Sequence, residues 1–147
     1  MSSHARPHPA LCALLLLVAP VTVRAQTKPS ALGSWEFDQA RREAFVTTLK
    51  TAQRGESKPG IDLQIELATV EHTVFTFGSD DRGSYLLRTD KRTGDRARKP
   101  IALHRDGADL LFTESDSSTV WRLQPIDAGR ILLIEEARRI TIPLKRR

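Results

Sequence analysis

The sequence predicts a mainly β protein, namely a single antiparallel up-and-down barrel preceded by one N-terminal helix. Two observations lead to this prediction. Beyond residue 60, short runs alternate apolar and polar residues, which is typical of half-buried strands. The breaks between the runs are short and rich in turn residues, so neighbouring strands are expected to pair antiparallel. The chain has 147 residues, 39% of them hydrophobic and 28% charged. This composition is typical of one folded domain.

Residues 1–25 have the features of a secretory signal peptide. Arg6 precedes the apolar run Ala10–Ala19, and Val23-Arg24-Ala25 supplies small or apolar residues before Gln26. The run is too short for a membrane span, which needs about 20 residues. No second apolar run of that length follows, so we expect the cleaved chain not to span a membrane. A chain rich in Ala and Arg suggests a bacterial protein exported to the periplasm or, alternatively, to the extracellular medium.

Cys12 is the single cysteine and lies inside the predicted signal peptide. The exported chain is therefore expected to contain no disulfide, no cysteine zinc site and no thiol nucleophile. Residues 26–31 form a polar leader that we expect to be flexible, and residues 32–147 are expected to form the barrel domain. A domain of this size can be held by its hydrophobic core alone.

One helix is expected before the strands. Leu32–Phe37 is a short apolar opening, and Asp38 is a candidate cap for a helix that runs to about Ala52. Phe45 and Leu49 lie one turn apart on this helix and form an apolar stripe. The Gly- and Pro-rich stretch Arg54–Gly60 is expected to end it.

The alternating runs predict about eight strands, a number that can close into a barrel without free edges. Asp106-Gly107 is the clearest hairpin turn, because Gly accepts a positive φ without strain. The longest break, Asp90–Pro100, is expected to be a basic loop. The expected strands are Ile61–Leu67, Thr73–Phe77, Ser84–Thr89, Ile101–Arg105, Asp109–Glu114, Thr119–Pro125, Arg130–Glu135 and Arg139–Leu144.

The motif Gly33-Ser34-Trp35, followed by this series of strands, resembles the lipocalin-like (calycin) barrels, and in particular small bacterial exported domains of that type. The resemblance implies that Gly33 and Trp35 open the first strand. It also implies that Trp35 closes one end of the barrel beneath a basic side chain from late in the chain. Arg138 or Arg139 would be that cover, through a cation–π contact.

Apolar residues on one parity of the strands are expected to face the barrel interior. They either fill it as a core or line a cavity for one small ligand. The aromatic residues among them are the candidate ligand-binding residues, namely Phe75, Phe77, Tyr85, Phe112 and Trp121.

The basic loop offers a second candidate site. Arg92, Arg96, Arg98 and Lys99 lie close together there and are candidates for binding an anionic envelope component or an acidic protein. Nucleic acid is not an expected partner, because aromatic residues are only 5% of the chain and the net charge is a mild +5.

No catalytic, metal or cofactor site is predicted. His72 and His104 are the only histidines outside the signal peptide, and a zinc site needs three or four ligands. Ser115 and Asp116 belong to a polar turn, whose composition is explained by turn geometry. The sequence contains no G-x-S-x-G, P-loop or G-x-G-x-x-G motif.

Three functional hypotheses remain. The leading one is a non-enzymatic binding protein that takes an apolar or amphipathic small molecule in the barrel. The second is an accessory protein of the cell envelope, with a filled barrel and a basic loop and tail that contact an anionic partner. An enzyme ranks third, since no catalytic set can be named. A cavity of a few hundred Å³ favours the first hypothesis, and a filled interior favours the second.

Overall fold

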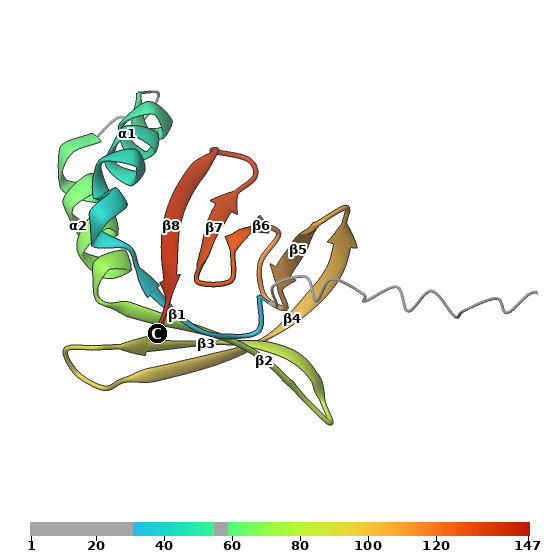
Figure 1. The fold of residues 1–147 in the computed structure, drawn as a ribbon. Helices are drawn as coiled ribbons and strands as arrows, with labels where there is room; N and C mark the ends of the chain where they lie inside the picture. The colour runs from blue at the N-terminus through green and yellow to red at the C-terminus, as the bar shows by residue number, and fades with distance from the viewer. Residues whose placement is uncertain (1–30, 55–58) are drawn as a thin grey trace, which may run out of the picture.

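Eight antiparallel strands close into one up-and-down barrel in the order β1 to β8, and two helices pack against it (Figure 1). The structure is a computed structural model that describes residues 31–54 and 59–147. The predicted signal peptide and nearly all of the predicted leader lie outside the described residues. The elements are β1 (Gly33–Phe37), a short 3-10 turn (Gln39–Arg41), α1 (Arg42–Gln53), α2 (Pro59–Glu71), β2 (Thr73–Asp80), β3 (Gly83–Asp90), β4 (Arg96–Asp106), β5 (Asp109–Glu114), β6 (Val120–Asp127), β7 (Arg130–Glu135) and β8 (Ile140–Arg146).

The predicted fold class is confirmed, and the Gly33-Ser34-Trp35 motif does open the first strand. β1 pairs with β2 on one side, where Trp35 faces Phe75, and with β8 on the other, where Trp35 faces Arg146. These two ladders close the sheet on itself, which leaves no unpaired edge along β1. The architecture is compatible with a lipocalin-like barrel. The described residues contain no cysteine, so no disulfide contributes to this barrel.

The predicted first helix is confirmed. The Asp38 carboxylate accepts a hydrogen bond from the Ala40 backbone N–H at 3.2 Å, and a 3-10 turn leads into α1. Phe45 and Leu49, the predicted stripe, are buried on α1. The capping residue and the apolar spacing therefore place the helix where the sequence indicates.

The predicted strand Ile61–Leu67 is wrong, because this segment belongs to helix α2. The alternation of apolar residues also contains a helical stripe, since Leu63, Leu67 and Val70 follow at spacings of four and three. These three residues pack on the core, whereas Ile65 is 59% exposed. Pro59 stands at the first position of α2, where its missing N–H costs no hydrogen bond. The count of eight strands holds because β1 takes the place of this segment.

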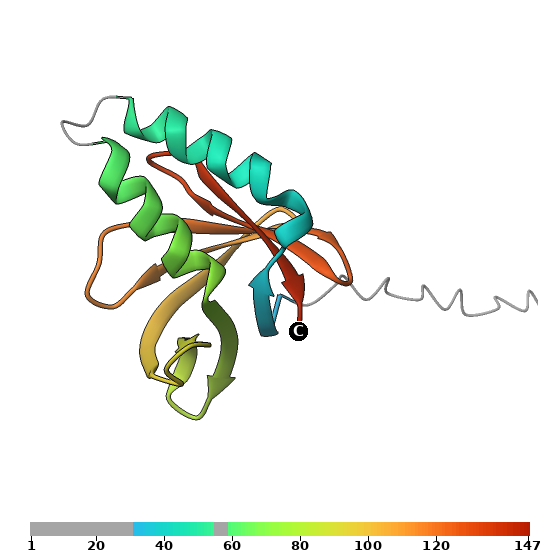
Figure 2. The ribbon, with the colours of Figure 1, turned by 90° about the vertical axis from the view of Figure 1, so that its left-hand side faces the viewer.

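Helices α1 and α2 cover the part of the barrel where β1 has ended (Figure 2). Beyond Phe37 the chain leaves the sheet, so the first half of β8 has no β1 partner. Helix α1 lies along this edge, and the Thr48 hydroxyl accepts a hydrogen bond from the Thr141 backbone N–H at 3.1 Å. Strands β1, β3, β5 and β7 all finish at one end of the barrel. We call this end the helix end, because the chain leaves it through α1 and returns to it through α2.

The hairpin at Asp106-Gly107 is confirmed, with Asp106 paired to Asp109 and Gly107 at a φ of +62°. The predicted loop Asp90–Pro100 is wrong in its extent. β3 and β4 form a long ladder that pairs Thr89 with Arg96 and Tyr85 with Pro100. Only a short turn remains between the strands, so most of the predicted basic loop is β-strand.

Candidate functional site

Of the five candidate ligand-binding residues, three lie inside the barrel, one lies at its helix end and one lies on its outer surface. Phe75, Phe77 and Phe112 are buried inside the barrel. Trp121 is partly buried at the helix end, where its ring stacks on Phe112 with centroids 6.5 Å apart. Phe112 in turn packs edge-to-face against Phe77 at 5.4 Å. The structure therefore joins three of the predicted residues in one aromatic row that runs from the core to the helix end.

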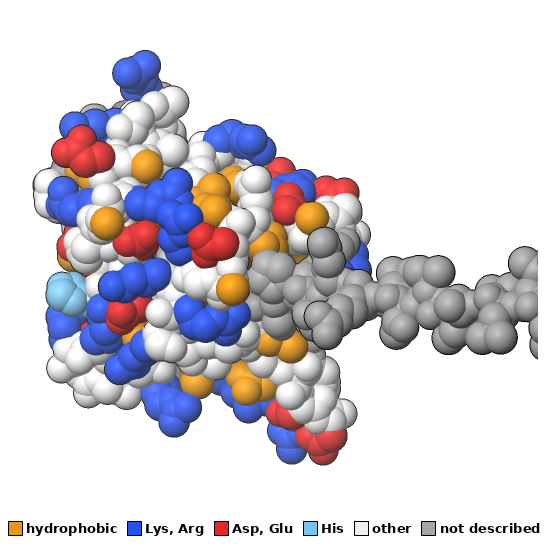
Figure 3. Space-filling model, viewed as in Figure 1, with side chains coloured by type: hydrophobic (Ala, Val, Ile, Leu, Met, Phe, Trp, Pro, Cys, Tyr) orange, Lys and Arg blue, Asp and Glu red, His pale blue; other side chains and the backbone are white. Residues whose placement is uncertain are grey.

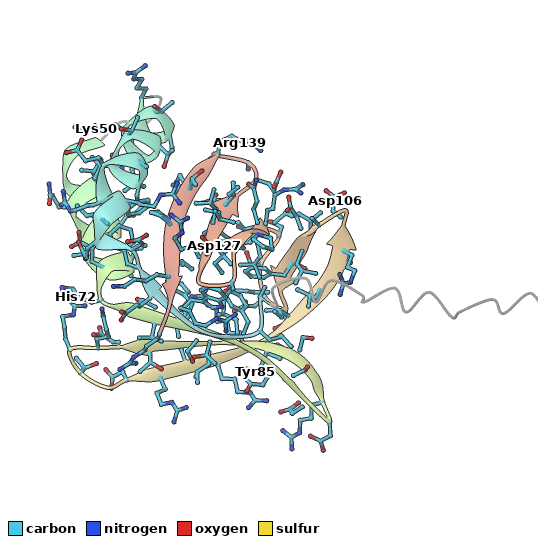
Figure 4. All side chains as sticks on the ribbon, viewed as in Figure 1. Lys50, His72, Tyr85, Asp106, Asp127 and Arg139 are labelled. Carbon is cyan, nitrogen blue, oxygen red and sulfur yellow. The ribbon has the colours of Figure 1, made fainter. Side chains whose placement is uncertain are left out.

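The placement of Tyr85 in the barrel interior is wrong. Leu86, which is fully buried, is the inward residue at this point of β3. Adjacent strand residues point to opposite faces, so Tyr85 lies on the outer surface (Figure 4). There the Arg98 guanidinium stacks over its ring at 3.7 Å. The sequence pattern predicts that Tyr85 faces inward, but the inward positions of β3 are shifted by one residue. A shift of one residue exchanges the two faces of a strand.

Side chains fill the centre of the barrel. The void beside Phe77, Ile101 and Leu123 measures about 10 Å³, which holds one water molecule at most. An apolar ligand of any size has no room at this level of the barrel. The openings large enough for a ligand lie at the two ends of the barrel, with about 440 Å³ at the end away from the helices and about 280 Å³ at the helix end.

The assignment of Arg138 or Arg139 as the cover of Trp35 is wrong. Both stand beside the β7–β8 turn at the helix end, and Figure 4 shows Arg139 there. The β1–β8 register instead places Arg146 beside Trp35, with its guanidinium carbon 4.3 Å from the ring centroid. Arg146 also donates to the Leu32 carbonyl at 3.2 Å. The predicted type of contact thus exists, but it uses a residue near the end of β8.

A largely apolar opening lies between α2 and the helix end of the barrel. It has a volume of about 280 Å³, and we call it the helix cleft. Helix α2 forms one wall, Phe45 of α1 contributes from the side, and the barrel supplies the floor through Trp121 and the start of β8. The lining residues are Phe45, Ile65, Glu66, Thr69, Val70, Trp121, Glu135, Arg138, Ile140 and Ile142.

A charged wall closes one side of the helix cleft. The Glu135 side chain is only 9% exposed, and Arg138 holds both of its oxygens, at 2.9 Å through Nε and 2.7 Å through a terminal nitrogen. The other terminal nitrogen of Arg138 lies 3.4 Å from a carboxylate oxygen of Glu66 on α2. The hydrogen bonds to Glu135, more than the more distant Glu66, raise the pKa of Arg138. Glu135 and Arg138 therefore form a fixed polar group beside an apolar floor.

Sequence reasoning found Trp121 but missed the rest of the helix cleft. The cleft is lined by Ile65, Glu66, Thr69 and Val70 only because residues 59–71 form a helix, whereas the alternating pattern predicts a strand over Ile61–Leu67. The i, i+4 relation between Ile65 and Thr69 was readable in the sequence. Nothing in the sequence indicated that α2 would lie across the barrel end.

The predicted anion-binding residues do not form one open basic site. Arg92 pairs with Asp90 at 2.9 Å, Arg98 pairs with Asp80, and Lys99 pairs with Asp116 at 2.9 Å. Arg96 is exposed and makes no ion pair within the part of the chain that the structure describes. Figure 3 shows the same pattern on one face of the molecule, where acidic side chains lie beside many of the basic ones. Most of the positive charge predicted for this region is therefore compensated locally.

The turn between β3 and β4 yields a pH prediction. The Arg92 side chain and backbone N–H both donate to the Asp90 carboxylate and lower its pKa from the ordinary value of 3.8 to about 2. A lowered folded-state pKa means that the contribution of Asp90 to stability is complete above its ordinary pKa and is lost as the pH falls towards 2. We expect a carbon-detected NMR titration of the Asp90 carboxyl group to give a midpoint near 2. A midpoint near the ordinary value would contradict this hydrogen-bonded turn.

The two histidines lie apart, His72 at the junction of α2 and β2 and His104 on the outer face of β4. Among the described residues, no group of three or more His, Cys, Asp or Glu side chains is arranged to hold a metal ion. No helix within residues 31–54 and 59–147 combines the length and hydropathy that a membrane crossing requires. The helix cleft, with its apolar floor and fixed charges, is suited to holding a small molecule by shape and polarity.

Comparison of the chain with protein-family models, with curated proteins and with solved structures gave no match.

Proposed function

We propose that this protein is a non-enzymatic small-ligand-binding protein that takes an apolar or amphipathic molecule in the helix cleft. The observation that carries the proposal is the contrast between the filled barrel centre and an open, largely apolar cleft of about 280 Å³ beside it. Cleft volumes for small molecules begin at about 300 Å³, so this one suits a small ligand such as two joined ring systems or a short alkyl chain.

The chemistry of the lining supports the proposal. Trp121, Ile140 and Ile142 supply an apolar floor, and Ile65, which is 59% exposed in the described structure, stands at the opening. Ligand sites commonly combine such a floor with a few fixed polar groups that orient the ligand. The Glu135–Arg138 pair is such a group, because each partner holds the other in place.

The proposal also covers the cellular location of the protein and the type of domain it forms. We infer from the features of residues 1–25 that the chain is exported, with the periplasm as the preferred location and the extracellular medium as the alternative. We also infer that it is a small lipocalin-like domain of a bacterium. The closed eight-stranded barrel and the Gly33–Trp35–Arg146 arrangement support this relationship. The ligand position then differs from a site inside the barrel, since side chains fill the centre.

The proposal predicts saturable binding of a neutral apolar probe to the helix cleft. We expect N-phenyl-1-naphthylamine to bind the purified chain at one site, with a rise in probe fluorescence. Trp121→Ala should weaken this binding at least tenfold, because it removes the largest apolar side chain of the floor. Tenfold corresponds to about 1.4 kcal/mol, less than the value of burying one large apolar side chain.

Tyr85→Ala is the matched control, because Tyr85 is also a large aromatic residue but lies on the outer surface of β3. It should leave the dissociation constant unchanged within twofold. Equal weakening by both substitutions, or no saturable binding at all, would contradict the proposal. Native mass spectrometry of the chain purified from its own cells would then decide between the two hypotheses. A bare mass would favour the envelope-partner hypothesis, and a mass excess that is lost on denaturation would show a bound small molecule.

A further inference from the structure

The charged wall of the helix cleft carries an excess of negative charge. Among the described lining residues, Glu66 and Glu135 supply two carboxylates and Arg138 supplies one guanidinium. Arg138 is committed to Glu135 through two hydrogen bonds, whereas its contact with Glu66 is longer, at 3.4 Å. The Glu66 carboxylate is thus the least compensated charge at the opening, and its side chain is 35% exposed.

An anionic ligand is disfavoured at this wall. To bind Arg138 closely it would have to displace Glu135, whose side chain is 9% exposed, or take the place of Glu66 at the other terminal nitrogen. Removing the partner of a buried carboxylate leaves an uncompensated charge, which is strongly unfavourable. Both carboxylates would also repel the ligand, since like charges in a partly buried site are weakly screened.

A cationic head group meets two favourable contacts. It can approach the partly exposed Glu66 carboxylate without breaking the Glu135–Arg138 pair. It would also lie beside the indole of Trp121, which lines the same cleft and stacks on Phe112. Cations bind the faces of indole rings through the ring quadrupole, most strongly where water is partly excluded.

We propose that the natural ligand of the helix cleft is an amphipathic cation, with an apolar body on the floor and an amine or quaternary ammonium head between Glu66 and Trp121. This inference rests on the proposed function, because it concerns the same cleft and names the class of molecule that fills it. Glu66 selects the ligand by its charge, and Trp121 contacts both the apolar body and the cationic head of the ligand.

Three probes with one alkyl chain test the inference, namely octyltrimethylammonium and octanoate, each below its micelle concentration, and octanol below its solubility limit. Binding to the full ¹⁵N-labelled chain can be followed at the indole N–H of Trp121. The sequence contains only two tryptophans, so Trp121→Phe assigns the two indole signals. We expect octyltrimethylammonium to bind about fivefold more tightly than octanol, the range of a partly exposed ion pair. Octanoate should bind more weakly than octanol.

Glu66→Gln is the decisive variant, because it keeps the size of the side chain and removes its charge. It should bring the affinities for octyltrimethylammonium and octanol within twofold of each other. Equal affinities for these two probes in the unmodified chain, or tightest binding of octanoate, would overturn the cation inference and leave the proposed function standing. If none of the three probes shifts the Trp121 signal, both fail.

Discussion

Replacing Trp35 by Ala should lower the free energy of unfolding by about 3–5 kcal/mol, the usual cost of deleting a large buried aromatic side chain. Trp35 is 0% exposed and lies on β1 where the barrel closes, between Phe75 of β2 and Arg146 of β8. Its indole N–H donates to the Ala31 carbonyl at 2.8 Å, so the substitution also leaves that buried acceptor unpaired. Urea denaturation followed by circular dichroism measures the change.

The matched control is Trp121→Ala, which removes the same side chain from a partly exposed position in the helix cleft. Its loss of stability should be clearly smaller than that of Trp35→Ala, although it weakens ligand binding. A loss below about 1 kcal/mol for Trp35→Ala is typical of surface positions. That result would contradict the role of Trp35 in closing the barrel.

Local patterns in the sequence were sufficient to predict most of the fold. The hairpin at Asp106-Gly107, the Asp38 cap and the stripe of Phe45 and Leu49 all depend on neighbouring residues, and all are confirmed. The error at residues 61–67 has the same local origin. Apolar residues at every second position include pairs four apart, which also fit a helical stripe, and only the docking of α2 on the core decides between strand and helix.

The helix cleft was harder to predict because it depends on contacts between distant segments. Trp121 was identified from its type and strand position, but Glu66 and Arg138 meet only through the packing of α2 against the β7–β8 turn. The cover of Trp35 shows the same limit. A basic residue late in the chain was expected, but the register of β8 against β1 determines that Arg146 fills this place and Arg138 does not.

Replacing Phe45 by Ala should also cost about 3–5 kcal/mol of the free energy of unfolding, because helix α1 is part of the core. Phe45 is 1% exposed and packs edge-to-face against Phe37 of β1, with ring centroids 5.5 Å apart. Helix α1 also covers the edge of β8 that β1 leaves unpaired, where Thr48 accepts the hydrogen bond from Thr141. The barrel and the helix should therefore unfold in one transition, and the same urea titration measures the loss.

Lys50→Ala is the control on the same helix, since Lys50 is exposed, as Figure 4 shows. It should change stability by no more than about 0.5 kcal/mol. Because Phe45 also lines the helix cleft, Phe45→Ala should weaken binding of N-phenyl-1-naphthylamine, whereas Lys50→Ala should not. If Phe45→Ala lost less than about 1 kcal/mol, α1 would not be part of the cooperative core. The helix cleft would then lack the rigid side wall that holds a ligand against Trp121.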